Sequence, residues 1–214
     1  MQRLLDKGLE QLTTMVFKMG EVAEKALSIS IGGYVRDRDT SNDVHELSDI
    51  LGTMTVEVEE KAFGLIAKYQ PVASDLRIIN SYMKTAYDFE RFGRYVWDIS
   101  YISKRFKGLG NCEEWIPDYI GEMGEKILLM VRISINALKS LDMELAKTVT
   151  KTEQEVDEMY FKYLGKLVEK AGATNECTVS SVLVVRYLER IADHATYITE
   201  AVVYIATGEK VNLR

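Results

Sequence analysis

Helix-breaking residues are scarce along this chain, and their scarcity limits its fold more than any other feature. Among 214 residues there are only two prolines, Pro71 and Pro117, and 14 glycines. Both prolines fall between segments in which apolar residues recur every three or four positions, the spacing of one helix face. The pattern predicts an all-α fold of long helices joined by few, short loops.

Six segments carry this helical period, three in each half of the chain. In the third the apolar seam runs from Ile79 to Val96, and in the sixth it runs from Val185 to Val202. The first segment is residues 4–35, the second ends near residue 69, and the third begins after Pro71 and ends near residues 107–111. The other three are residues 115–140, 143–171 and 176–207.

A short sequence occurs twice, once in the third segment of each half. FERFGRY (89–95) and LERIADH (188–194) share a Glu-Arg pair followed by a bulky apolar residue and a small one. The equivalent positions favour an internal repeat over a six-helix chain with a chance similarity. We therefore expect two tandem, structurally similar three-helix bundles, at residues 1–110 and 111–214.

The net charge, the N-terminal sequence and the two cysteines indicate which classes of protein this chain can belong to. The net charge is −6 and there is no basic stripe, which argues against nucleic acid as a partner. The N-terminus lacks a signal-peptide pattern and no apolar run approaches about 18 residues, so we expect a cytoplasmic protein that does not span a membrane. Cys112 and Cys177 lie far apart and form no CxxC motif, so reduced thiols are expected.

Two pairs of acidic residues lie beside the seams of the fifth and sixth segments. Glu153 and Asp157 are four positions apart, as are Glu189 and Asp193, so each pair shares a helix face. Like charges at this spacing repel, and the cost rises near an apolar seam. No basic residue lies three or four positions from either Glu153 or Asp157.

Carboxylates on neighbouring helices form a typical site for a hard or borderline cation such as Fe, Mn, Mg or Zn. The four acidic residues of the second half therefore predict a metal site. The alternative is that they are half-exposed acids paired with Arg186, Arg190 or solvent. His194 does not have the ExxH spacing of di-iron oxidases, so we interpret it as a polar residue at a helix interface rather than a ligand.

The first copy of the repeat reverses one charge. Glu90 is followed at i+4 by Arg94, where the second copy has Asp193, so a repelling pair becomes an attracting one. Such a pair has no need of a metal. The sequence thus predicts a metal site in the second half only. It shows no P-loop, no GxSxG and no catalytic cysteine–histidine pair, so no catalytic residue is expected.

QPVASDLR (70–77), taken with FERFG (89–93), LERIADH and the terminal YIATGE (204–209), resembles the PhoU family of phosphate-uptake regulators over about residues 5–209. The resemblance implies two similar three-helix bundles and a non-enzymatic cytoplasmic regulator. It also implies action at the phosphate ABC transporter, and in many bacteria on a sensor histidine kinase, with metal clusters held by E(D)xxxD motifs in each half.

The second half matches that motif and the first half departs from it. Arg94 replaces an aspartate, and Ser48 and Gly52 stand where the second helix would supply acids. Acidic residues and a histidine remain nearby, so Asp49 and Glu90 are the candidates for a weaker metal site or a structural role. The remaining residues of this group are His45, Glu46, Glu57 and Asp88.

The leading hypothesis is therefore a regulatory adaptor, a negative regulator, that docks on the ATPase subunit of the phosphate ABC transporter, on a sensor histidine kinase, or on both. It would reach the membrane through partners, and a homodimer is allowed. Iron is the first choice of metal, with Zn, Mn or Mg as alternatives, and nothing marks a phosphate site. The rival hypotheses are an accessory regulator of a secondary phosphate permease and a carboxylate-bridged di-metal enzyme, which would need ExxH ligands.

Overall fold

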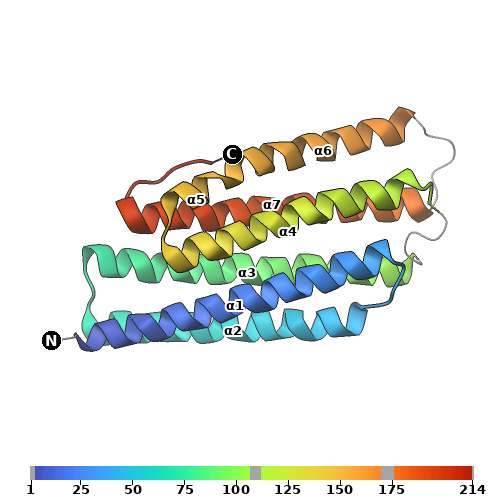
Figure 1. The fold of residues 1–214 in the computed structure, drawn as a ribbon. Coiled ribbons are helices and arrows are strands. Elements are labelled where there is room, and N and C mark those ends of the chain that lie inside the picture. Colours follow the sequence, from blue (N-terminus) through green and yellow to red (C-terminus); the bar gives the residue numbers. More distant parts are fainter. Residues whose placement is uncertain (1–2, 107–111, 170–175, 214) are drawn as a thin grey trace.

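The computed structural model describes residues 3–106, 112–169 and 176–213 of the chain, and the regular structure in these ranges is helical (Figure 1). Five long helices match the predicted segments closely, and the fifth segment is divided. The helices are α1 (Leu4–Val35), α2 (Ser41–Tyr69), α3 (Ala73–Arg105), α4 (Trp115–Ser140), α5 (Met143–Lys147), α6 (Val149–Glu169) and α7 (Glu176–Thr207).

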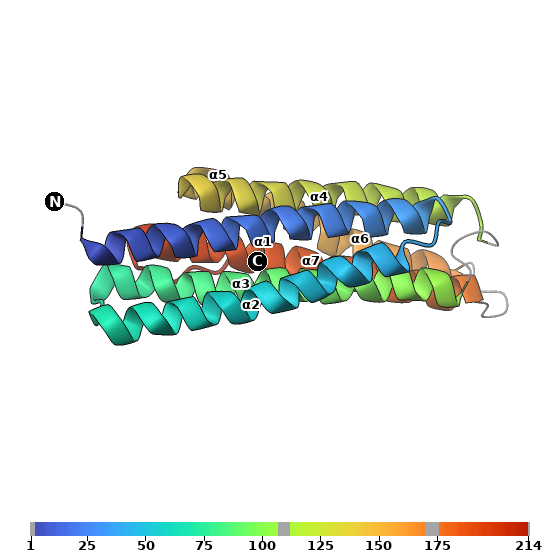
Figure 2. The ribbon, with the colours of Figure 1, turned by 90° about the horizontal axis from the view of Figure 1, so that it is seen from below.

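The helices run lengthwise in an elongated bundle, with α1–α3 on one side and α4–α7 on the other (Figure 1). Helix α3 packs along α7, and α1 packs against α4, so these four helices form the contact between the two halves (Figure 2). Among the described residues, α2 contacts only α1 and α3, and α6 contacts only α4, α5 and α7. Helices α2 and α6 are therefore the outer helices.

Apolar side chains from both halves form one continuous core. The seams predicted for α3 and α7 are buried along their whole length, including Phe89, Val96, Leu188 and Val202. Gly93 permits the close approach of α2 to α3, because a Cβ atom there would lie 2.8 Å from Leu51 Cδ1. Ala192, at the equivalent position of the second copy, is buried as well.

The single helix predicted over 143–171 is wrong at Thr148. Asp142 caps the short α5 by accepting hydrogen bonds from the backbone N–H groups of Glu144 and Leu145. The Thr148 N–H then bonds the carbonyl of Leu145, three residues back, and its hydroxyl donates to the same oxygen. This tighter bonding replaces the i→i−4 pattern and separates α5 from α6. Residues 170 and 171 lie outside the described ranges.

The expectation of reduced thiols is also wrong in this structure, because Cys112 and Cys177 are joined by a disulfide. Their Cα atoms are 5.5 Å apart although 65 positions separate them in the sequence. The start of α7 lies beside the start of α4 at one end of the bundle, which brings the cysteines together (Figure 1). Within the described ranges, no helix combines the length and apolar character needed to cross a bilayer.

Candidate functional site

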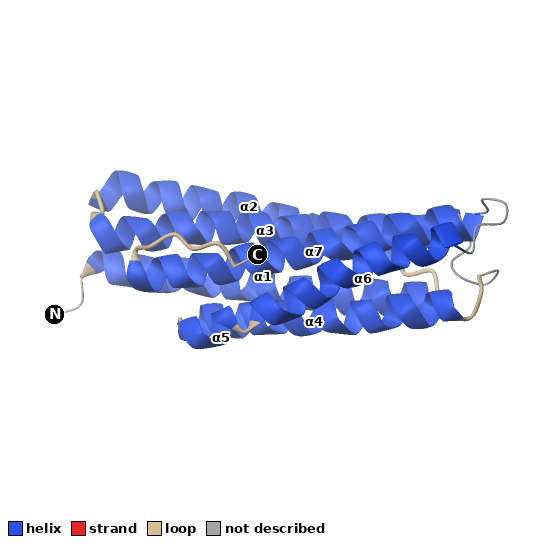
Figure 3. Ribbon diagram, turned by 90° about the horizontal axis from the view of Figure 1, so that it is seen from above, coloured by secondary structure: helices blue, strands red, loops and turns tan. Residues whose placement is uncertain are grey.

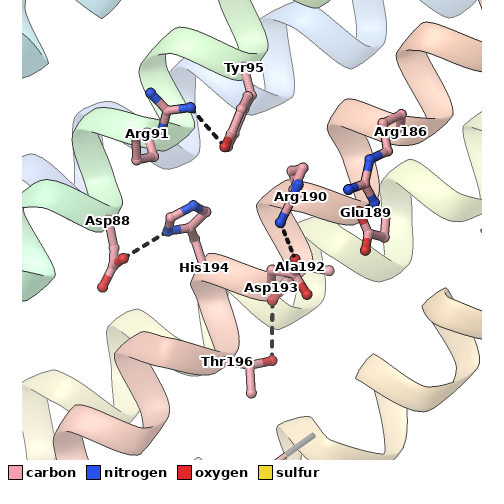
Figure 4. Close-up of polar contacts among 10 residues, drawn as sticks. All are labelled: Asp88, Arg91, Tyr95, Arg186, Glu189, Arg190, Ala192, Asp193, His194 and Thr196. Atoms are coloured by element: carbon pink, nitrogen blue, oxygen red, sulfur yellow. Dashed lines mark hydrogen bonds and ion pairs between the residues drawn. The ribbon is translucent and has the colours of Figure 1, made fainter.

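The two candidate metal ligands of α7, Glu189 and Asp193, lie on one side of that helix, and each pairs with an arginine one turn before it. Arg186 Nη1 donates to Glu189 Oε2 at 2.5 Å, and Arg190 Nη1 lies 3.2 Å from Asp193 Oδ2 (Figure 4). The Asp193 residue is 7% exposed, whereas both arginine side chains reach solvent. The i−3 arginines thus supply positive charge to both acids.

Negative charge is nevertheless crowded around Glu189. Burial raises the pKa of its carboxyl group above the ordinary value, and the charge of Asp193 adds to the shift. Arg186 and Arg190 oppose it, while Asp157 on α6 raises the pKa further. Asp157 therefore lies close enough to α7 to affect Glu189 electrostatically, as the sequence analysis expected of acids on adjoining helices.

The candidate ligands of α6, Glu153 and Asp157, are more exposed to solvent than the buried Asp193 of α7. Asp157 is exposed and Glu153 is half-buried, while the neighbouring Glu155 pairs with Lys126 on α4 at 2.7 Å. Over the described ranges, no three His, Cys, Asp or Glu side chains are grouped so that they could hold a metal ion. The four carboxylates have the right chemistry for a cation, but as placed here they do not form a cage for one. The metal site stays a prediction.

The first-half candidates form separate contacts with basic side chains. Arg94 Nε donates to Glu90 Oε1 at 3.0 Å, so the attraction predicted from the charge reversal is confirmed. On α2, His45 Nδ1 lies 3.2 Å from Asp49 Oδ2, with both side chains largely exposed. Asp49 and Glu90 therefore each contact a basic residue of their own helix.

A buried pair that the sequence analysis missed joins the two halves. Asp88 on α3 and His194 on α7 are both buried, and the Asp88 Oδ1 and His194 Nδ1 atoms are 2.8 Å apart (Figure 4). Burial raises the pKa of Asp88 and the contact with His194 opposes that shift. The interface role expected for His194 is confirmed, and Asp88 faces the other half rather than a first-half metal site.

Three aromatic rings surround the His194 imidazole. Tyr197 meets it edge-on with ring centroids 5.4 Å apart, and the rings of Tyr95 and Tyr87 lie at 5.8 and 6.3 Å. The only sequence signal for this pair was the position of both residues next to seam residues, Phe89 for Asp88 and Ala195 for His194. That signal gives no partner, because it does not fix the register between α3 and α7.

A cavity of about 390 Å³ opens beside this pair, between α3, α7 and the C-terminal residues. Asp88, Tyr87 and Tyr197 line it, together with Lys84 and Lys210. After Gly208 ends α7 in a left-handed conformation, the chain turns back along the helix (Figure 3). The Leu213 N–H then donates to Glu200 Oε1 at 2.9 Å. The cavity is thus a polar and aromatic space at the boundary between the halves.

Comparison with known proteins gives consistent matches along the whole chain. A family model described as "PhoU domain" matches residues 16–102 and 120–202. A Clostridium acetobutylicum protein named "Phosphate-specific transport system accessory protein PhoU homolog" is 31% identical, over 99% of this chain and 98% of that protein. A protein of the same name from Caulobacter vibrioides is 32% identical over 94% of this chain and 89% of its own length.

Two solved structures share the fold. The crystal structure of PhoU from Pseudomonas aeruginosa has a TM-score of 0.89 and 26% identity, and the match covers 95% of this chain and 99% of that one. The phosphate transport system regulatory protein PhoU from Streptococcus pneumoniae has a TM-score of 0.85 at 21% identity, covering 97% and 99% of the two chains. The all-α fold and the repeat of two similar bundles are confirmed.

Proposed function

Because the chain belongs to the PhoU family, we propose that it is a cytoplasmic accessory regulator of phosphate uptake that docks on the ATPase subunit of a phosphate ABC transporter. One observation carries the proposal: relatives named as accessory proteins of phosphate-specific transport align with nearly the full length of this chain and of their own. Because the alignment covers nearly the whole length of both proteins, we assign the role of these relatives to the entire chain rather than to one of its halves. Negative regulation of a sensor histidine kinase is the second docking activity in this proposal.

The outer helices offer matching apolar positions for docking. On α2, Val56 and Phe63 are 54% and 59% exposed; on α6, Phe161 and Val168 are 63% and 78% exposed. Both pairs are seven residues apart, so each lies on one face of its helix. We place the partner contact on these faces, because exposed apolar residues at repeated positions are unfavourable in water unless something covers them.

A pulldown tests this docking. The full chain is immobilised and offered the ATPase subunit of the phosphate ABC transporter from the same genome, with and without phosphate. We expect capture by the wild type and much weaker capture by Phe161→Asp or Phe63→Asp. Leu129→Asp is the control, since Leu129 on α4 is 51% exposed but lies outside the proposed faces. Absence of binding in every condition, or binding only to a secondary phosphate permease, would overturn the proposal.

The metal prediction is tested separately. A cation, with iron as first choice, would relieve the charge crowding at Glu189 if Glu153, Asp157, Glu189 and Asp193 turned toward it. Protein purified without chelator is analysed for metal content as wild type, as Glu153→Ala/Asp157→Ala, and as Glu90→Ala. We expect the double variant to lose metal and Glu90→Ala to keep it. Equal metal content in all three proteins would remove these residues as ligands.

A further inference from the structure

The disulfide ties together two helix starts in the second half. Cys112 lies three residues before Trp115, where α4 begins, and Cys177 is the second residue of α7. The Cα separation of 5.5 Å is within the usual range for a disulfide. Helices α4 and α7 are also the second-half helices that pack against α1 and α3. The bond therefore fixes one end of α4 and α7 relative to each other, and these are the two helices through which the second half contacts the first.

The two sulfur atoms have different chemical surroundings. Cys177 is 7% exposed and lies in the first turn of a long helix, where the positive end of the helix dipole stabilises a thiolate. Cys112 is the more exposed residue of the two. An incoming thiolate would attack the sulfur of Cys112, the more exposed residue, and Cys177 would depart as the stabilised thiolate. This difference favours a disulfide that exchanges with other thiols over one that is permanent.

We propose that Cys112 and Cys177 form a reversible thiol–disulfide switch that exchanges with low-molecular-weight disulfides such as glutathione disulfide. In oxidation, one protein thiolate attacks the glutathione disulfide and releases one glutathione thiolate. The second protein thiolate attacks the resulting mixed disulfide and releases the other. Two cysteine thiols are oxidised to one disulfide and one glutathione disulfide is reduced to two glutathione thiols. In reducing compartments such bonds are usually transient and redox-sensing.

The two forms differ in what holds the end of the second bundle. In the oxidised form a covalent bond joins the start of α7 to the segment before α4. In the reduced form that end is held by side-chain packing, including Trp115 against Tyr163, with ring centroids 5.5 Å apart. Local opening of the first turns of α4 and α7 is therefore easier after reduction.

The first experiment uses the purified full chain, reduced with dithiothreitol and then treated with glutathione disulfide. We expect both cysteines to become unreactive to alkylation without bound glutathione. Hydrogen exchange of the first amides with i→i−4 bonds, in the second turns of α4 and α7, should slow several-fold, while exchange in the middle of α2 stays constant. Cysteines that stay fully alkylatable would overturn the switch. An internal disulfide that leaves hydrogen exchange unchanged would also overturn it.

Single substitutions provide the matched controls. Cys112→Ser and Cys177→Ser should each retain a glutathione adduct under the same treatment and show the faster exchange of the reduced wild type. The comparison of oxidised with reduced wild type needs no substitution, so the test survives a variant that folds poorly.

A second experiment reads the state in cells. Cells making the full chain are quenched with acid and alkylated, with or without a pulse of the thiol oxidant diamide. We expect alkylated cysteines before the pulse and protected cysteines after it. Protection in both samples would show a permanent bond and alkylation in both would show inert thiols, and either result contradicts the proposal.

Discussion

At the scale of single residues, Asp88 and His194 form a buried polar contact between the two halves, where α3 packs along α7. Asp88→Ala would leave the His194 ring nitrogen without its partner in a buried position, and such a loss costs about 1–3 kcal/mol. Asp88→Asn keeps an oxygen of similar shape and should cost less. Urea unfolding at neutral pH, followed by circular dichroism, measures both. No loss of stability in Asp88→Ala would mean that the contact contributes nothing, and equal losses would mean that the amide oxygen does not restore it.

The raised pKa of Asp88 also predicts a pH dependence. Well below about pH 4 the carboxyl of Asp88 is protonated in the folded and unfolded states alike. Its ionisation then makes no difference to the free energy of unfolding. As pH rises from there through the raised folded-state pKa, the unfolded carboxyl ionises freely while the buried one resists, and the free energy of unfolding falls. Urea titrations of wild type and Asp88→Asn across this range should show the decline in the wild type only. A parallel decline in both proteins would assign it to other groups.

Residue-level contacts could be predicted from sequence where they are local. The Glu90–Arg94 pair follows from i,i+4 spacing alone, and the structure confirms it. The arginine pairs of Glu189 and Asp193 were foreseen as the alternative to a metal for the same reason. Asp88 and His194 are 106 positions apart, and their contact depends on how two helices are registered. Helical periodicity carries no such information.

At the scale of helices, the close approach of α2 and α3 at Gly93 gives a stability prediction. An alanine Cβ there would lie 2.8 Å from Leu51 Cδ1 and 3.3 Å from the backbone of Ser48. Gly93→Ala should therefore destabilise the protein by about 1–3 kcal/mol, the usual cost of overpacking. The measurement is urea unfolding of the variant beside wild type.

Gly52→Ala on α2 is the matched control. Its Cβ would meet nothing within 4 Å, so only the gain in helix propensity remains. We expect stabilisation by about 0.5–1 kcal/mol. Loss of stability at position 52 would contradict the open space around Gly52, and no loss at position 93 would contradict the close packing of α3 on α2.

Helix boundaries followed from sequence because periodicity and breaking residues are local signals. Helix α1 spans 4–35 and α4 spans 115–140, as predicted. The break at Thr148 could not be predicted in this way, because threonine is a weak helix breaker and Val149 continues the apolar seam. It depends on bonds that the threonine makes to Leu145.

At the scale of the whole molecule, the repeat in the sequence predicted two bundles but not the way they meet. The contacts of α3 with α7 and of α1 with α4 merge both halves into one core. Cys112 and Cys177 lie within the second half, where α4 packs against α7, and their proximity was missed because it also depends on which helix faces pair. Long-range contacts of this kind depend on which helix faces pair, and several pairings satisfy the same apolar pattern.

A shared core predicts that the two halves unfold together. The chain has two tryptophans, Trp97 on α3 and Trp115 on α4, so each half contains its own fluorescent probe. Trp97→Phe leaves the probe of the second half, and Trp115→Phe leaves that of the first. In urea each variant should give the same midpoint by fluorescence as by circular dichroism, because separating the halves would expose the α3–α7 core to water.

Asp88→Ala distinguishes one cooperative unit from two bundles that unfold together by coincidence. Placed in both single-tryptophan backgrounds, it should lower both fluorescence midpoints by the same amount, because the interface belongs to both halves. If the two bundles were independent, Asp88→Ala would separate the two midpoints. It would lower mainly the midpoint reported by Trp97, which lies on the same helix as Asp88. In that case the contact between α3 and α7 would be too weak to couple the repeats, and each would behave as its own folding unit.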